Sequence, residues 1–306
     1  MSDPFLRFES GKISLGNKDL MVNSANLSMS PSLAVEKVYG NYKRGLSGAG
    51  VEFVGFSPIQ PLTGTLDIGF YISAETFSKD GSPNNINRIF DIKSGMSELP
   101  VNGNKVGRYS FDNAFLTSLS FKLVPFGVIQ ASASYAIYGT ITNKGVADTF
   151  NKSEVDFAHG LKSFGDLKIG SSIAEDVVGG RFEISELSYS IKVERKTHYR
   201  VRESENTSVN TNASGVLPCR VSVEGIEKKM NITSNEIVPF LNSYGVQQRL
   251  AGVNSDLMVD ASAFLYSLQD TQIAKFDCSG RIVDQSLSIS EGQHSMGSIS
   301  IREVVS

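Results

Sequence analysis

The sequence contains no tryptophan, only two cysteines and only three histidines among its 306 residues. Neither cysteine has a second thiol or an imidazole at the short spacing that zinc sites use, so a structural metal centre is not expected. Cys219 and Cys278 are expected to be buried free thiols, as in a reducing compartment, with a disulfide between them as the alternative. The chain is therefore predicted to fold without metal or cofactor.

Long apolar runs and an excess of charge of one sign are also missing. No stretch approaches the roughly 20 apolar residues that a membrane-spanning helix needs. A net charge of −3 and a pI near 5.7 exclude a generally basic, nucleic-acid-binding surface. The first residues, Met1 to Phe5, lack the basic-then-apolar layout of a secretory signal, so we expect the chain to be made in the cytoplasm.

Groups for catalysis are scattered along the chain. The histidines, at positions 159, 198 and 294, fall in a linker, a strand and a turn, and are interpreted as surface or interface residues. There is no Gly-x-Ser-x-Gly elbow, no phosphate-binding glycine loop and no calcium-loop spacing among the aspartates. The sequence therefore predicts that the protein is not an enzyme.

What the sequence does contain is alternation of apolar and polar residues, the period of a β-strand. Long helical patterns are few, so the chain is predicted to be mainly β. Strands are expected at 20–38 (interrupted near Pro31), 65–72, 115–124 and 128–142, the last two forming a hairpin. Short flanking helices are expected at 86–93 and 236–244, and long loops at 40–58 and 202–215.

This plan occurs twice. Leu-Ser-x-Ser opens an alternating run at both 27–30 and 187–190, and Gly-x-[Ile/Leu]-x-[Ile/Leu]-Gly occurs at both 11–16 and 165–170. The later elements follow in the same order in both halves. We therefore predict two tandem β-barrel or β-sandwich domains, 1–145 and 165–306. A linker, 146–164, joins them and is expected to hold a short connecting helix.

Serine alternates with apolar residues in strand after strand. Since alternate residues of a strand share a face, one face of the sheet is predicted to be lined by small, neutral hydroxyls. An ordinary solvated face is the alternative, but such faces favour larger residues than serine. The serines concerned are Ser28, Ser30, Ser118, Ser120, Ser132, Ser134, Ser188, Ser190, Ser286, Ser288, Ser290, Ser298 and Ser300.

With this doubled unit, the chain resembles the tail tube proteins of tailed bacteriophages and the related secretion-system tube protein. The resemblance lies in the order of elements and in the closing Leu-Ser-[Phe/Ile] and serine-alternating strands, once per half. It implies a self-assembling virion protein, made in the host bacterial cytoplasm, whose stacked rings form the hollow conduit for DNA ejection. Three chains in a pseudo-sixfold ring, or six chains, would satisfy closed symmetry.

The resemblance also implies partners and contacts. The expected partners are a tape-measure protein and double-stranded DNA in the lumen, further copies of the chain, and sheath, baseplate and tail terminator proteins; no membrane is expected. By position, the two long loops and their flanking charges would contact neighbouring subunits or rings. The candidates are Glu36, Lys37, Lys43, Arg44, Glu194, Arg195, Lys196 and Arg202. A baseplate or initiator ring protein is the alternative role, and a carbohydrate-binding β-sandwich of a host-recognition device is the rival from another class.

Overall fold

The structure is a computed structural model. It describes residues 12–16, 18–30, 33–39, 52–58, 63–74, 100–139, 141–143, 156–169, 172–173, 181–182, 185–198, 220–235 and 259–305. The predicted helices 86–93 and 236–244 lie outside these residues, and within them the structure contains no helix. The prediction of a mainly β fold is confirmed.

Eighteen strands make up the described fold. The strands of the first half of the chain are β1 (Lys12–Leu15), β2 (Lys18–Ser30), β3 (Leu33–Tyr39), β4 (Glu52–Pro58), β5 (Thr63–Tyr71), β6 (Asn104–Val106), β7 (Tyr109–Phe111), β8 (Ala114–Leu123), β9 (Gln130–Tyr138) and β10 (Thr142–Asn143). Those of the second half are β11 (Phe164–Ile169), β12 (Ser172–Ile173), β13 (Arg181–Phe182), β14 (Glu186–His198), β15 (Arg220–Ser234), β16 (Val259–Tyr266), β17 (Gln272–Ser288) and β18 (Met296–Val305).

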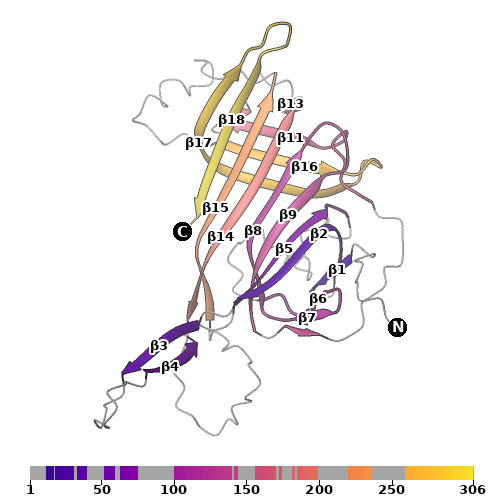
Figure 1. Ribbon diagram of the computed structural model, residues 1–306. Helices are drawn as coiled ribbons and strands as arrows, with labels where there is room; N and C mark the ends of the chain where they lie inside the picture. Colours follow the sequence, from indigo (N-terminus) through magenta and orange to yellow (C-terminus); the bar gives the residue numbers. More distant parts are fainter. Residues whose placement is uncertain are drawn as a thin grey trace, which may run out of the picture.

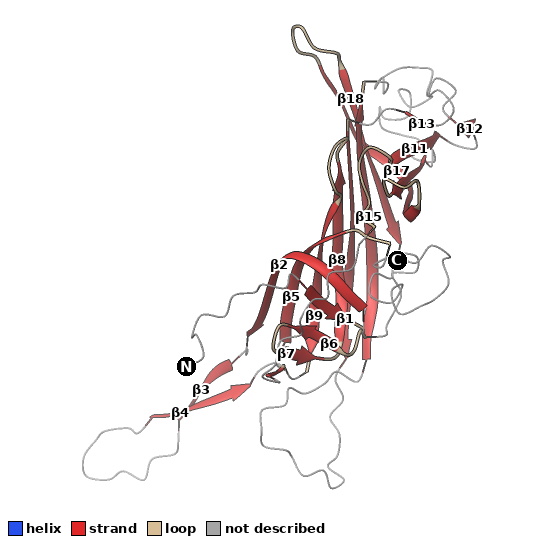
Figure 2. Ribbon diagram, turned by 90° about the vertical axis from the view of Figure 1, so that its right-hand side faces the viewer, coloured by secondary structure: helices blue, strands red, loops and turns tan. Residues whose placement is uncertain are grey.

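Sixteen of these strands join in one antiparallel sheet. Their order is β10-β7-β6-β1-β2-β5-β9-β8-β14-β15-β18-β17-β16-β11-β12, with β13 beside β11. The remaining two strands, β3 and β4, form a separate hairpin that projects away from the sheet (Figure 1). The long central strands lie side by side, while β1, β6 and β7 cross in front of them in the view of Figure 2.

The centre of this sheet repeats itself. Eight strands in the order β2-β5-β9-β8-β14-β15-β18-β17, here called the main sheet, consist of two sets of four. Across the sheet, the neighbouring strands of each set are the first, second, fourth and third of that set in chain order. The last strand of the first set, β8, pairs with the first strand of the second set, β14, through six residue pairs. We call this contact the internal seam.

The pairing of residues repeats as well as the order of strands. Ser120 pairs with Ser132 in the first half, and Ser286 pairs with Ser298 in the second, so both partners shift by 166 positions. The same shift holds for all seven pairs from Phe115–Ala136 to Lys122–Gln130. The strand irregularity at position 117 also recurs 166 positions later, at position 283. This repetition supports the predicted duplication.

The ladders place the repeated Leu-Ser-x-Ser motif differently from the sequence comparison. When the residue pairing is followed from β2 to β5 and from β14 to β15, Leu27 occupies the position in the first half that Tyr189, and not Leu187, occupies in the second. The strands β2 and β14 therefore correspond at a shift of 162 positions. The motif comparison was therefore two residues out of register. A displacement of two keeps every side chain on its predicted face, because a strand has a period of two.

The core lies between the main sheet and a smaller second layer. In the first half, β1 contributes Ile13 and Leu15, both buried, and they belong to the same apolar cluster as Leu66 and Phe70 of β5. In the second half, β16 and the first part of β17 cover the main sheet, and Phe276 is fully buried there. The strand β17 serves both layers, since residues up to 280 pair with β16 and later residues pair with β18.

Two predicted connections differ from expectation. Residues 52–58 of the predicted loop 40–58 form β4, which pairs with β3 over seven residue pairs. Within the predicted linker, residues 156–163 contain bridges and turns instead of a helix. Ala158 is fully buried and bridges to Ser267 of the second half, while its neighbours bridge to Ser73 and Val128 of the first. This part of the linker therefore packs between the halves.

Candidate functional site: the serine face and its edges

The predicted serines whose side chains are described within the strands of the main sheet lie on its face opposite the core. In β8, Leu119 and Phe121 are buried while Ser118 and Ser120, which alternate with them, are partly exposed, and β9 alternates in the same way. Of the serines in the prediction, Ser28, Ser132, Ser286, Ser288 and Ser290 are exposed, and Ser118, Ser120, Ser134, Ser188, Ser190 and Ser298 are intermediate. Ser300 is buried, and the side chain of Ser30 lies outside the described residues.

Strand pairing gathers these serines into rows. Ser190 of β14 stands opposite Ser120 of β8, and Ser120 stands opposite Ser132 of β9. The hydroxyls of Ser120 and Ser132 are 2.8 Å apart and hydrogen-bonded, and Ser28 bonds the Thr65 hydroxyl at 2.6 Å. Cross-strand hydroxyl pairs of this kind make a close-set, uncharged surface over the strands of the first half of the chain.

The second half of this face carries charges that the sequence did not reveal. The row that begins with Ser120 and Ser190 continues through Lys229, Arg302 and Arg281 on the next three strands. Arg302 forms an ion pair with Glu227 at 2.7 Å. The expectation of a neutral face is therefore correct for the first half, where Lys122 and Asp67 are the charged exceptions among the described residues, and wrong for the second.

The sequence signal for these charges was ambiguous. Lys228 and Lys229 are adjacent, so one of them must point to each face of the strand. The structure turns Lys228 inward, where its Nζ lies 2.8 Å from the carboxylate of Glu303 and both side chains are only 15% exposed. Lys229 is left on the serine face. The register of β15 against its neighbouring strands decides which of the two lysines points inward and which lies on the serine face.

The candidate contact residues have different surroundings. Glu36 and Lys37 belong to β3, whose side chains lie outside the described residues, as do Lys43, Arg44 and Arg202 altogether. Glu194 pairs with Lys192 at 3.5 Å, and Lys196 pairs with Glu224 at 3.1 Å, all on exposed strand surface. Such pairs contribute little stability, about 0–1 kcal/mol each.

Arg195 is engaged within the chain. Its Nε donates to the backbone oxygen of Leu116 at 2.7 Å, and its guanidinium lies 5.5 Å from the centroid of the Phe115 ring. Both partners belong to β8, so Arg195 joins β14 to β8 beyond the last residue pair of the internal seam. An arginine held by a hydrogen bond and an aromatic face in this way fixes the seam.

The core side of the internal seam is aromatic. Phe121 of β8 stacks on Tyr189 of β14, with ring centroids 5.4 Å apart, and lies 4.6 Å from Phe276 of β17. A ring from the first half is thus inserted in the core of the second. Burial raises the pKa of Tyr189 and of Tyr135 well above the usual tyrosine value. Burial, and next the charge of Glu303, raise the pKa of Cys278 to about 12, so this thiol stays protonated.

Groups that could perform chemistry are not brought together in the described part of the chain. His198 Nε2 shares a hydrogen bond of 2.8 Å with the Ser222 hydroxyl, and His294 is exposed in the loop between β17 and β18. Nδ1 of His159 accepts a hydrogen bond from the backbone of Leu161. No three His, Cys, Asp or Glu side chains among the described residues are placed to hold a metal ion.

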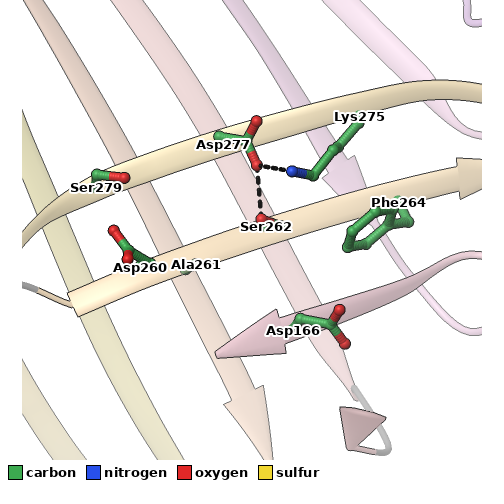
Figure 3. A pocket seen from close by; sticks show the side chains of 8 residues that line it. All are labelled: Asp166, Asp260, Ala261, Ser262, Phe264, Lys275, Asp277 and Ser279. Atoms are coloured by element: carbon green, nitrogen blue, oxygen red, sulfur yellow. Dashed lines mark hydrogen bonds and ion pairs between the residues drawn. The ribbon is translucent and has the colours of Figure 1, made fainter. Parts of the chain in front are cut away.

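A depression of about 370 Å³ lies on the outer side of β11, β16 and β17 (Figure 3). Its lining includes Asp166, Asp260, Asp277 and Phe264. Asp277 accepts a hydrogen bond from Ser262 at 2.6 Å and pairs with Lys275 at 2.7 Å, and this lysine lies over the Phe264 ring. The Phe264 ring is therefore contacted by Lys275 and also by the ring of Phe164, which stacks on it with centroids 5.0 Å apart.

No family model matches this chain, and no curated protein matches it. Among the described residues, no helix is long and apolar enough to cross a membrane.

Proposed function

We propose that the chain is a structural subunit of a tube: a tail tube protein of a tailed bacteriophage, whose stacked rings form the conduit for DNA ejection. The observation that carries this proposal is the main sheet, in which one four-stranded order occurs twice and continues across the internal seam. A sheet that already joins two such units edge to edge is suited to closing into a ring with further units.

The serine face supplies the second support. The core layer covers one side of the main sheet, which leaves the other side to face a lumen. In the first half this face carries few cations, so it would make few phosphate contacts and hold passing DNA weakly. In the second half Glu227 neutralises Arg302, which reduces the attraction of that sector for phosphate.

The remaining parts of the proposal follow from the resemblance to tube proteins. Rings of three or six chains would enclose a tape-measure protein and later double-stranded DNA, and would meet sheath, baseplate and tail terminator proteins in the virion. A baseplate or initiator ring of the same fold is the alternative role. A carbohydrate-binding module is the rival, and a clear hit for the purified protein on a glycan array would favour it.

A charge on the serine face tests the conduit. Ser120 and Ser190 are opposite each other across the internal seam, so the variant Ser120→Lys/Ser190→Lys places two cations at one point of the face. We expect virions with normal tails whose DNA ejection is slowed. Thr142→Lys, on exposed β10 away from this face, is the matched control. Ejection at the wild-type rate in the double variant would contradict the assignment of this face to the channel wall.

A further inference from the structure

Within the described residues, each end of the main sheet has an edge along which no further strand pairs, here called an open edge. At one end, residues 24–30 of β2 pair with β5 on one side and with no described strand on the other. At the other end, residues 284–288 of β17 pair with β18 and with no described strand on their outer side. An edge of this kind can extend the sheet by pairing with a strand of another chain.

Each open edge has a counterpart that is already paired inside the chain. The shift of 166 positions places β17 residues 284–288 on β8 residues 118–122, and the shift of 162 positions places β2 residues 24–30 on β14 residues 186–192. In the first half of the chain that edge of β8 is occupied, because β14 pairs with it. The internal seam therefore joins the same two kinds of edge that remain open at the ends.

Apolar side chains are also more exposed at the open edges than at the internal seam. Phe121 and Leu123 of β8 are 4% and 1% exposed, because the second half of the chain covers them. Their counterparts 166 positions later, Leu287 and Ile289, are 44% and 74% exposed. At the other end Leu27 is half-buried, while its counterpart Tyr189 is 1% exposed. Apolar side chains are thus exposed at the end positions where a further unit is missing.

We propose that these edges bind each other between copies of the chain, so that β17 of one copy pairs with β2 of the next as β8 pairs with β14. The inference rests on the proposed tube function and gives it a specific contact. Adding 166 to each β8 residue number and subtracting 162 from each β14 residue number converts the residue pairs of the internal seam into the register of the new contact. Its antiparallel pairs are Ile289–Ala25, Ser288–Asn26, Leu287–Leu27, Ser286–Ser28, Gln285–Met29 and Asp284–Ser30.

The occupant of each edge is a second copy because the chain itself carries the complement. A contact between two different edges is heterologous, so it continues from copy to copy until the ring closes. Leu287 would enter the first-half core of the neighbouring copy beside Leu27, as Phe121 enters the second-half core beside Tyr189. The serine faces of successive copies would then form one continuous surface.

Disulfide trapping tests the register. In a Cys219→Ser background, chains carrying Ser286→Cys are mixed with chains carrying Ser28→Cys, and the mixture is oxidised gently. We expect a disulfide-linked dimer that contains one chain of each kind. Replacing Ser28→Cys by Ser24→Cys is the control: it moves the thiol four residues, about 13 Å along the strand, beyond the roughly 7 Å limit for a disulfide. Equal cross-linking in the control, or predominant linkage between identical chains, would overturn the proposal.

A second variant separates this inference from the proposed function. Leu287→Glu places a charge in the proposed contact at a position that is exposed in the single chain, so the chain should fold with an unchanged circular dichroism spectrum and remain monomeric. If rings still form with Leu287→Glu, or if rings form but the Ser286→Cys and Ser28→Cys chains within them do not cross-link, the proposed contact is wrong and the tube function stands. If the unmodified chain forms no oligomer at any concentration, both are wrong.

Discussion

The two four-stranded units of the main sheet differ in what lies beyond their last strand: β14 pairs with β8, whereas no described strand pairs with the outer side of β17 along residues 284–288. Where β8 meets β14, Phe121 and Leu123 are buried, and Arg195 bonds across to Leu116. Where β17 ends the sheet, Leu287 and Ile289 occupy the same places and are exposed. This difference supports the proposal that the exposed apolar residues at this edge belong to a contact between copies, with the internal seam as its example within the chain.

The largest expected effect is at the core of the internal seam. Phe121→Ala should lower the free energy of unfolding by about 3–5 kcal/mol, because it empties a site between Tyr189 and Phe276. Leu287→Ala, its counterpart at the open edge, should cost less than about 1 kcal/mol in the monomer, since the side chain is 44% exposed. Denaturant unfolding at low protein concentration measures both. Equal losses of unfolding free energy would contradict the interpretation that these are equivalent positions, one covered by a further unit and the other not.

Much of this comparison was accessible from the sequence. The strand predicted at 115–124 is β8, Ala114–Leu123, and the strand predicted at 65–72 is β5, Thr63–Tyr71. The side of the sheet was also predicted, because the alternation of Ser118 and Ser120 with Leu119 and Phe121 is a local property of one strand.

Register was the part that local patterns could not give. A shift of two residues leaves an alternating strand unchanged, so Leu27 was compared with Leu187 although the ladder sets it against Tyr189. The outward lysine of the pair 228–229, the extra strand β4 and the packing of Ala158 between the halves likewise depend on partners far away in the chain. Non-local pairing is not encoded in any single window of residues.

The next effect concerns the arginine of the internal seam. Arg195→Ala removes a hydrogen bond to Leu116 and the contact with the Phe115 ring, and should destabilise the chain by about 1–3 kcal/mol. Arg195→Lys should restore part of this, because lysine keeps the charge but not the planar group. Thermal unfolding of the two variants beside wild type measures the ranking. A lysine variant no better than alanine would assign the effect to guanidinium geometry instead of charge.

A smaller effect concerns pH. The folded-state pKa of Cys278 is raised to about 12 from 9.0, so its contribution to stability is complete below pH 9 and is lost progressively as the pH rises from 9 to 12. In a Cys219→Ser background, Cys278→Ala should make the fall in unfolding midpoint between pH 8.5 and 10.5 shallower. The remaining slope comes from the buried tyrosines, whose pKa values are also raised. An unchanged slope would mean that Cys278 ionises as readily in the folded chain as in the unfolded one.

The smallest effect sharpens the comparison directly. An exposed ion pair, Lys122–Glu186 at 2.9 Å, joins β8 to β14, and the corresponding positions at the open edges are Ser288 and Ser24. The double variant Ser288→Lys/Ser24→Glu should transfer this pair to the contact between copies and strengthen assembly by up to ~1 kcal/mol, less at high salt. The reversed variant, Ser288→Glu/Ser24→Lys, carries the same two charges on exchanged strands. It tests whether an ion pair strengthens assembly whichever strand carries the lysine.

The central claim is that the chain is two units of a ring joined in the same way as successive chains. Negative-stain microscopy of the full-length protein at high concentration, together with its native mass, tests it most directly. We predict closed rings or stacked tubes whose visible repeating units number twice the chains present, as three chains of 33.1 kDa would give in a ring of apparent sixfold symmetry. Monomers alone, or dimers closed by a twofold axis with no rings, would contradict it.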